Sequence, residues 1–342
     1  MTTTVCVTGA SGFIGAYIVR ELLEHGYHVR GTVRSLKNPT QYAYLTSLPG
    51  AAERLELLPG DLLIEGSYDL AIAGCDTVIH SASPYVLDVK DPQTDLVDPA
   101  LNGTLNVLDA CKKATTVKRV VLTSSNAAIT DEPEPGKVYS EKDWNEKSSL
   151  TRNPYYYSKT VAERAAWDFM KEKSPSFDLV VINPTAVIGP SLGPSLNPTN
   201  GVFQALLTGV YPAIMNLSWG FVDVRDVAKA HRLAMETPDA KGRFLCVNKT
   251  VSAREVVDLL KREGYTYKLP RLSLESGFGN FLVKLMSYAQ PSGIGTYLRT
   301  QVGRDYLFDN NKIKQELGLE FIPVEQSILE TTADVIQWGH VQ

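Results

Sequence analysis

The sequence has few cysteines and histidines, and neither residue type is clustered. The chain of 342 residues contains four cysteines, at positions 6, 75, 111 and 246, and none is at CxxC spacing. Its five histidines form no HxxxH or HxxEH pattern. Scattered cysteines in a chain of cytosolic character indicate reduced, mostly buried thiols. We therefore expect neither disulfides nor a metal site.

The sequence also lacks long apolar runs and any concentration of charge of one sign. No apolar run approaches the roughly 18 residues that a membrane-spanning helix needs. The N-terminal MTTTVCVTGA has no basic segment followed by an apolar one, so it does not resemble a signal peptide. The net charge is -4, and no basic stripe is available to nucleic acid. We expect a cytoplasmic globular protein whose partner is a small molecule.

What the chain does contain is a regular alternation of short β-rich apolar runs with helical patterns. The predicted strands are 4–8, 28–33, 54–58, 76–82, 119–124, 178–183 and 243–248, and the predicted helices include 13–24, 95–114, 224–237, 252–263 and 325–337. Strands that are apolar on both faces are typical of a parallel sheet covered by helices. The pattern predicts an α/β protein with a Rossmann-type doubly wound sheet.

The alternation loosens after residue 184, where NPTAVIGPSLGPSLNPTNG (183–201) is rich in Pro, Gly, Ser and Asn and is predicted to be a long loop. We assign 1–183 and 218–248 to the Rossmann domain. The segments 184–217 and 249–342 are assigned to a smaller C-terminal lobe that binds substrate over the edge of the sheet.

A glycine-rich turn follows the first predicted strand. In VCVTGASGFIGAYIVRELLEHG, the strand is followed by Gly9, Gly12 and Gly15 and then by an amphipathic helix. The first glycine permits a tight turn, the second lets the backbone approach a pyrophosphate, and the third lets helix and strand pack closely. The helix N-terminus then faces the phosphates with its partial positive charge. This context predicts a dinucleotide site.

The GxxGxxG spacing resembles that of the extended short-chain dehydrogenase/reductases, and the resemblance covers nearly the whole chain. It implies that Asp61 and Leu62 border the adenine, and that the small residues Ala82 and Ser83 let the cofactor cross close to the backbone. Pro184 and Val187 are expected to border the nicotinamide. The further cofactor contacts that we expect are Ser11, Phe13, Ile14, Ser81, Thr123 and Thr185. His80 is expected to be a packed residue beneath the cofactor.

Residues in and after the second predicted strand indicate which dinucleotide the protein binds. An NAD enzyme usually has an acidic residue about 20 positions after the glycines, but this chain has none between Glu24 and Glu53. It has Arg34 and Lys37, which could bind a 2′-phosphate, whereas Arg30 is expected to face solvent. The basic stretch favours NADP, with Arg34 as the first candidate.

Three consecutive tyrosines precede a lysine in NPYYYSK (153–159), and one of them is a candidate proton donor. Asn153 and Pro154 are read as the cap and first residue of a helix. On that helix Tyr155 and Tyr156 can both reach the face of Lys159, whereas Tyr157 cannot. The family motif Tyr-x-x-x-Lys selects Tyr155 and Lys159, and the resemblance identifies Ser125 in TSSNAA as the catalytic serine.

The resemblance implies reduction of a carbonyl group. The lysine ammonium favours the phenolate and so lowers the pKa of the tyrosine phenol, which makes it a better proton donor at neutral pH. Tyr155 would protonate the oxygen while Ser125 hydrogen-bonds it, and Lys159 would also hold the nicotinamide ribose.

Among these reductases, the chain is most similar to the dihydroflavonol reductase, cinnamoyl-CoA reductase and fungal aldehyde and ketone reductase branch. It lacks the Asn-Trp-Tyr-Cys-Tyr signature of cinnamoyl-CoA reductases, and it has Thr130 where dihydroflavonol reductases commonly have a substrate-reading Asn. A general NADPH-dependent carbonyl reductase is therefore predicted. Its expected substrate contacts are Tyr85, Val86, Thr130 and Phe221. The alternatives are an NAD-retaining sugar-nucleotide epimerase or dehydratase and a non-catalytic dinucleotide-sensing module.

Overall fold

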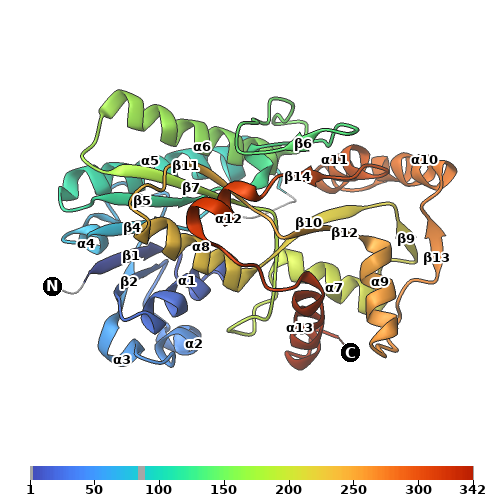
Figure 1. Ribbon diagram of the computed structural model, residues 1–342, viewed down its shortest axis with the longest axis horizontal. Helices are drawn as coiled ribbons and strands as arrows, with labels where there is room; N and C mark the ends of the chain where they lie inside the picture. The colour runs from blue at the N-terminus through green and yellow to red at the C-terminus, as the bar shows by residue number, and fades with distance from the viewer. Residues whose placement is uncertain (1–2, 84–88, 342) are drawn as a thin grey trace.

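The computed structural model describes residues 3–83 and 89–341, and Figure 1 shows a large sheet with helices on both sides and a second group of elements beside it. The large sheet has seven strands in the order β11-β7-β5-β4-β1-β2-β3, all parallel. Its strands are β1 (Thr4–Thr8), β2 (His28–Val33), β3 (Leu55–Pro59), β4 (Thr77–His80), β5 (Arg119–Thr123), β7 (Asp178–Pro184) and β11 (Gly242–Cys246). The predicted Rossmann-type fold is confirmed.

Two helical layers cover the sheet. On one face, α1 (Phe13–Glu24) packs against α8 (Val224–Glu236) over a core that includes Val5, Val7 and Phe244. On the other face, α5 (Asp98–Ala114) packs against α6 (Pro154–Lys173) over a second core. These apolar helix faces bury the two sides of the sheet, which explains why the strands are apolar on both faces. Shorter elements of this part are η1 (Pro39–Tyr42), α2 (Ala43–Thr46), α3 (Ala51–Arg54), α4 (Asp69–Ile72), η2 (Gln93–Val97) and η3 (Asn126–Ala128).

The smaller lobe is built around a three-stranded sheet in the order β12-β10-β8. Its strands are β8 (Ala186–Ile188), β10 (Ser218–Asp223) and β12 (Lys249–Ser252), and β9 (Ala213–Met215) pairs with β13 (Leu272–Leu274). The helices are α7 (Pro198–Thr208), α9 (Ala253–Arg262), α10 (Gly277–Met286), η4 (Ser287–Ala289), α11 (Ser292–Gln301) and α13 (Val324–Gln337). Figure 1 shows these elements grouped to the right of the large sheet.

The predicted boundary at residue 218 does not follow the sheets. We assigned 218–248 to the larger domain, but β10 pairs with β8 and β12 of the lobe, and only α8 and β11 join the large sheet. The chain therefore passes between the two parts repeatedly. It leaves the large sheet after β7, returns at α8 and β11, leaves again at β12, and returns once more at α12 (Asn311–Leu317), which packs on β11. Finally, β14 (Leu307–Phe308) pairs with β6 (Val138–Tyr139).

The predicted long loop is partly ordered into elements. The segment 183–201 contains β8 and the beginning of α7, which starts at Pro198 with the side chain of Asn197 accepting a hydrogen bond from the backbone N–H of Asn200 at 3.0 Å. Over the described ranges 3–83 and 89–341, the structure contains no helix with the length and apolar character needed to cross a membrane.

Candidate active site

A cavity of about 1960 Å³ extends from the glycine turn across the carboxyl ends of the parallel strands and beneath the lobe. Such a position is where ligands bind in open α/β sheets. Of the predicted cofactor residues, Lys37 is exposed and does not line the cavity. Those that line it are Gly9, Ser11, Gly12, Phe13, Ile14, Gly15, Arg34, Asp61, Leu62, Ser81, Ala82, Ser83, Thr123, Tyr155, Lys159, Pro184, Thr185 and Val187.

The glycine turn is shaped by close backbone approaches. Gly9 has a φ of +67°, and a Cβ atom there would lie 2.9 Å from the Cα of Ala82. A Cβ atom at Gly15 would collide with the carbonyl oxygen of Gly9. Both positions therefore require glycine. Helix α1 begins directly after Gly12, and the residues of its first turn, Phe13, Ile14 and Gly15, line the cavity. The N–H groups of this turn have no partner within the helix and are available to an anion there.

The basic residues Arg30, within β2, and Arg34, directly after it, lie in different surroundings. Arg34 follows the last residue of β2, is exposed, and lines the cavity. Arg30 instead forms an ion pair with Glu56 at 3.2 Å and does not line the cavity. Because the guanidinium of Arg34 lies at the end of β2, the residues present fit a dinucleotide with a 2′-phosphate.

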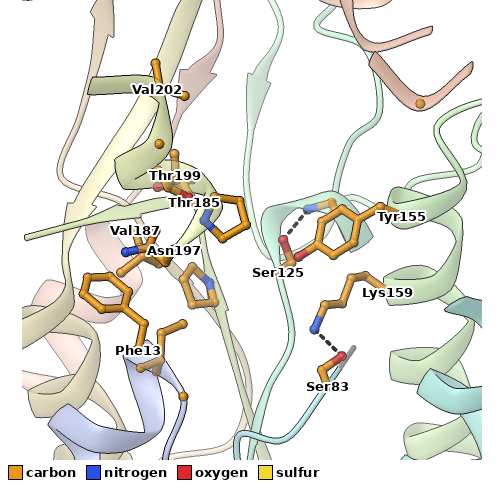
Figure 2. Close-up of a pocket in the computed structure, with 18 of the residues that line it drawn as sticks. Phe13, Ser83, Ser125, Tyr155, Lys159, Thr185, Val187, Asn197, Thr199 and Val202 are labelled. Carbon is orange, nitrogen blue, oxygen red and sulfur yellow. Dashed lines mark hydrogen bonds between the residues drawn. The ribbon is translucent and has the colours of Figure 1, made fainter. Parts of the chain in front are cut away.

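The catalytic candidates meet at the other end of the cavity. Tyr155 lies in the first turn of α6, and Ser125 follows β5 (Figure 2). In this view the two side chains point toward one another. The Ser125 hydroxyl accepts a hydrogen bond from the backbone N–H of Ala127 at 3.1 Å. Of the neighbouring phenols, Tyr156 also lines the cavity, whereas Tyr157 does not.

Lys159 lies one helical turn after Tyr155. Its ammonium nitrogen is 6.0 Å from the centroid of the Tyr155 ring and donates a hydrogen bond to the Ser83 hydroxyl at 2.9 Å. Burial lowers the pKa of Lys159 to about 8, while the charge of Glu163 raises it. Lys159 therefore remains mostly cationic at neutral pH.

His80 is a buried residue beneath the cavity, as predicted. Its Nδ1 lies 2.7 Å from the hydroxyl of Thr8, and the same hydroxyl accepts hydrogen bonds from the backbone N–H groups of Ser81 and Ala82. Burial and the nearby Lys159 lower the pKa of His80 to about 3. The imidazole is therefore neutral at neutral pH.

Asn153 occupies the N-cap position of α6, as predicted, but its side chain does not cap the helix. Its φ of +48° places it in the left-handed region, and its side chain makes no capping hydrogen bond to α6. The side-chain amide instead donates to Asp131 and, at 3.2 Å, to Thr300 of α11. Pro154 does begin the helix.

Of the predicted substrate contacts that the structure describes, one lines the cavity and one does not. Phe221 lines the cavity but is 2% exposed and belongs to the core of the lobe. Thr130 is buried, does not line the cavity, and bonds to the backbone oxygen of Glu132 at 3.4 Å. Tyr85 and Val86 lie outside the described residues.

Several aromatic residues that line the cavity were not named among the predicted contacts, and two of them, Trp219 and Tyr297, bond to one another. Trp219 stacks on Phe221 at a centroid distance of 5.8 Å, and its indole N–H donates to the Tyr297 hydroxyl at 3.0 Å. Both Trp219 and Tyr297 line the cavity. Trp219 lies two residues before Phe221 on β10, so the alternation of a strand places both on one face. Because Phe221 was a predicted contact, the two-residue spacing could have identified Trp219 as a second one.

Comparison with known proteins places this geometry in a family. The NAD dependent epimerase/dehydratase family matches residues 5–248. The chain belongs to this family. It is 43% identical to a cinnamoyl-CoA reductase of Medicago truncatula over 335 residues, which cover 96% of this chain and 94% of that protein. It is 40% identical to a bifunctional dihydroflavonol 4-reductase/flavanone 4-reductase of Malus domestica, with 78% of each chain covered.

Among solved structures, this family member is similar to yeast methylglyoxal/isovaleraldehyde reductase complexed with NADPH. The TM-score is 0.81 at 29% identity, with 98% of this chain and 99% of that chain covered. The predicted resemblance to the extended short-chain dehydrogenase/reductases is confirmed, including the branch that contains dihydroflavonol and cinnamoyl-CoA reductases.

Proposed function

We propose that this chain is an NADPH-dependent carbonyl reductase that converts uncharged, largely apolar aldehydes and ketones to alcohols at Ser125, Tyr155 and Lys159. The predicted class of enzyme, an oxidoreductase that reduces C=O groups, agrees with the reductases among its relatives and with the NADPH-bound yeast neighbour. The observation that carries the proposal is the meeting of Ser125, Tyr155 and Lys159 in the cavity that begins at the glycine turn.

The cofactor would be held along the near wall of the cavity. The free N–H groups at the start of α1 suit a pyrophosphate, and Arg34 suits a 2′-phosphate. Ser83 and Lys159 lie beside one another where the ribose of the nicotinamide would be held, and Pro184 and Val187 would border the ring. NADPH, when bound, supplies the hydride that reduces the carbonyl carbon.

The protein supplies the proton and stabilises the developing charge. Tyr155 donates its phenolic proton to the carbonyl oxygen, and the Ser125 hydroxyl hydrogen-bonds that oxygen as it becomes negative. The N–H of Ala127 donates to the Ser125 oxygen at 3.1 Å, and the Ser125 hydroxyl donates over 3.4 Å to the side-chain oxygen of Asn126. When substrate binds, the hydroxyl exchanges this long hydrogen bond for one to the substrate oxygen. The Lys159 ammonium stabilises the phenolate that remains on Tyr155.

The lobe side of the cavity favours an uncharged substrate. The described residues that the lobe contributes there carry no charge, and they include Tyr211, Met215, Leu217, Trp219, Leu274, Val283, Met286, Tyr297 and Tyr306. A CoA thioester brings several phosphate charges, which proteins usually bind with Arg or Lys. An aromatic or aliphatic aldehyde needs only apolar contacts, and the indole and phenol rings provide them.

A cytoplasmic location is part of the proposal. The four cysteines are all free and buried, as expected for a protein of a reducing compartment.

The test uses substrate pairs that differ only in the group attached to the carbonyl. Oxidation of NADPH is followed at 340 nm with an aromatic aldehyde and with the CoA thioester of the corresponding acid, and the aldehyde is repeated with NADH. We expect kcat/KM for the aldehyde to exceed that for the thioester by at least about 10-fold, equivalent to about 1.4 kcal/mol. Equal use of both would contradict the uncharged-substrate assignment. Interconversion of UDP-sugars without net loss of cofactor would instead favour the epimerase alternative.

A further inference from the structure

A buried ion pair that the proposed chemistry does not use lies behind the catalytic residues. Glu163 is on α6, one turn after Lys159 and two turns after Tyr155, and is 1% exposed. Its carboxylate lies 2.6 Å from the Nε of Arg243, which is on β11 and is 7% exposed. Removing two charges from water is costly, and such a pair is weak evidence of a stabilising role by itself. Its contacts indicate what else it does.

The carboxylate of Glu163 connects three elements of the site. It accepts hydrogen bonds from the Ser124 hydroxyl at 2.5 Å and from the Asn183 side-chain amide at 2.8 Å. The same Asn183 nitrogen donates to the backbone oxygen of Ser125 at 3.1 Å. Glu163 therefore joins α6, which carries Tyr155, to the ends of β5 and β7. A further donor is the indole N–H of Trp167, from the next turn of α6, at 3.3 Å.

Arg243 extends these connections to the segment that follows Ser125. Its guanidinium donates to the backbone oxygens of Ala128 at 3.3 Å, Glu141 at 3.1 Å and Asp143 at 2.5 Å. It also lies 4.0 Å from the ring centroid of Trp144. Both charged groups are thus extensively hydrogen-bonded, which is the condition under which a buried pair can specify one arrangement.

The electrostatic surroundings of Lys159 involve the same carboxylate. Lys159 faces the neutral His80 from β4 and the Ser83 hydroxyl, while Tyr155 and Glu163 lie on its own helix. The charge of Glu163 opposes the effect of burial on the pKa of Lys159, and Arg243 from β11 is the counter-ion of Glu163. Loss of the Glu163 charge would therefore make the Lys159 ammonium easier to deprotonate.

We propose that Glu163 is a positioning residue whose carboxylate, paired with Arg243, holds Ser125 and the Tyr155–Lys159 face of α6 in register. The inference rests on the reductase function proposed above. Aldehyde-dependent oxidation of NADPH by the unmodified protein is measured first, so that a failure of the function is distinguished from a failure of the positioning role.

The test measures kcat from pH 6 to pH 10 for three variants of the full chain. Glu163→Gln removes the charge, and we expect kcat at pH 7 to fall by about 10-fold or more, because small misplacements of reacting groups are costly. We also expect the alkaline decline of kcat to move to lower pH. Asn183→Ala breaks the connection to Ser125 but keeps the charge. It should lower kcat without moving the alkaline decline.

Trp167→Phe is the matched control, because it removes a donor to the same carboxylate without breaking a connection to β5 or β7. It should leave both kcat and the pH profile unchanged. If Glu163→Gln does not fold, the positioning role is tested by comparing the kcat of Asn183→Ala with that of Trp167→Phe. The proposal is overturned if folded Glu163→Gln keeps kcat within about threefold and the same alkaline decline, or if Asn183→Ala retains full kcat, whatever happens to the melting temperature.

Discussion

Replacing Lys159 with methionine should abolish reduction and at the same time make the protein more stable at neutral pH. Lys159 is buried, with 8% of its surface exposed, and its ammonium donates to one hydroxyl, that of Ser83. The charge of Glu163 offsets the burial of this ammonium only in part, so the charged form is held against its preference for water. Methionine has a similar length and fills the same space without a charge. Lys159, the proposed catalytic lysine, is therefore expected to destabilise the fold that contains it.

The size of the effect follows from the pKa of Lys159. Burial lowers this pKa from 10.5 to about 8, which corresponds to a cost of about 3 kcal/mol when the ammonium is buried. Because the folded pKa lies below the unfolded one, the full cost applies below about pH 8 and disappears as pH rises toward 10.5. Lys159→Met also removes the hydrogen bond to Ser83, which lowers the free energy of unfolding by about 1 kcal/mol. The net gain for methionine at pH 7 is about 2 kcal/mol.

The assay is urea unfolding of both proteins, without cofactor, at pH 7 and pH 9.5. The electrostatic cost to the unmodified protein falls to about 1 kcal/mol at pH 9.5, so the advantage of Lys159→Met should nearly vanish there. Lys147→Met is the control, because Lys147 pairs with Glu134 on the surface and should change stability by less than about 0.5 kcal/mol. A Lys159→Met protein that is less stable at pH 7, or whose difference is the same at both pH values, would refute the reasoning.

Three further substitutions test the site. Tyr155→Phe should lower kcat by about 100-fold or more, as expected for loss of a general acid, while NADPH binding measured by fluorescence changes little; Tyr156→Phe should remain active, and the reverse result would transfer the proton-donor role to Tyr156. Arg34→Glu should raise the Kd for NADPH at least about 10-fold more than the Kd for NADH, because it replaces a charge-assisted contact to the 2′-phosphate with repulsion; equal losses would show that Arg34 does not read that phosphate. Trp219→Ala should raise KM about 10-fold for an aromatic aldehyde but little for a two-carbon one, measured by the same absorbance assay.

The features that the sequence predicts correctly are local ones. The glycine turn is one continuous strand–turn–helix segment, and Gly9 and Gly15 are required by backbone approaches within that segment or to the neighbouring β4 loop. The strands of the large sheet are short runs that are apolar on both faces, so each can be recognised without knowing its partner. The positions of Tyr155 and Lys159 one turn apart on α6 follow from their spacing.

The features that were predicted wrongly depend on distant partners. Asn153 has the sequence of a helix cap, but its side chain bonds to Asp131 and to Thr300, which is 147 residues away. β10 was assigned to the larger domain, although it pairs with β8 and β12 of the lobe. Its own residues do not show which strands it pairs with. Thr130 illustrates the same limit. Its spacing from Ser125 cannot show that the chain after η3 turns it away from the cavity.

The repeated passage of the chain between the two sheets has a consequence for engineering. The lobe that we propose to contact substrate is assembled from several separate stretches, interrupted by α8 and β11 of the larger part. The lobe therefore cannot be separated from the large sheet by dividing the chain at one position. Replacing it with one continuous segment from a relative would also exchange elements of the large sheet. Chimeras that alter selectivity should therefore exchange short stretches, such as the segment from β9 to β10 together with α11, while keeping β11 and α12 from the recipient.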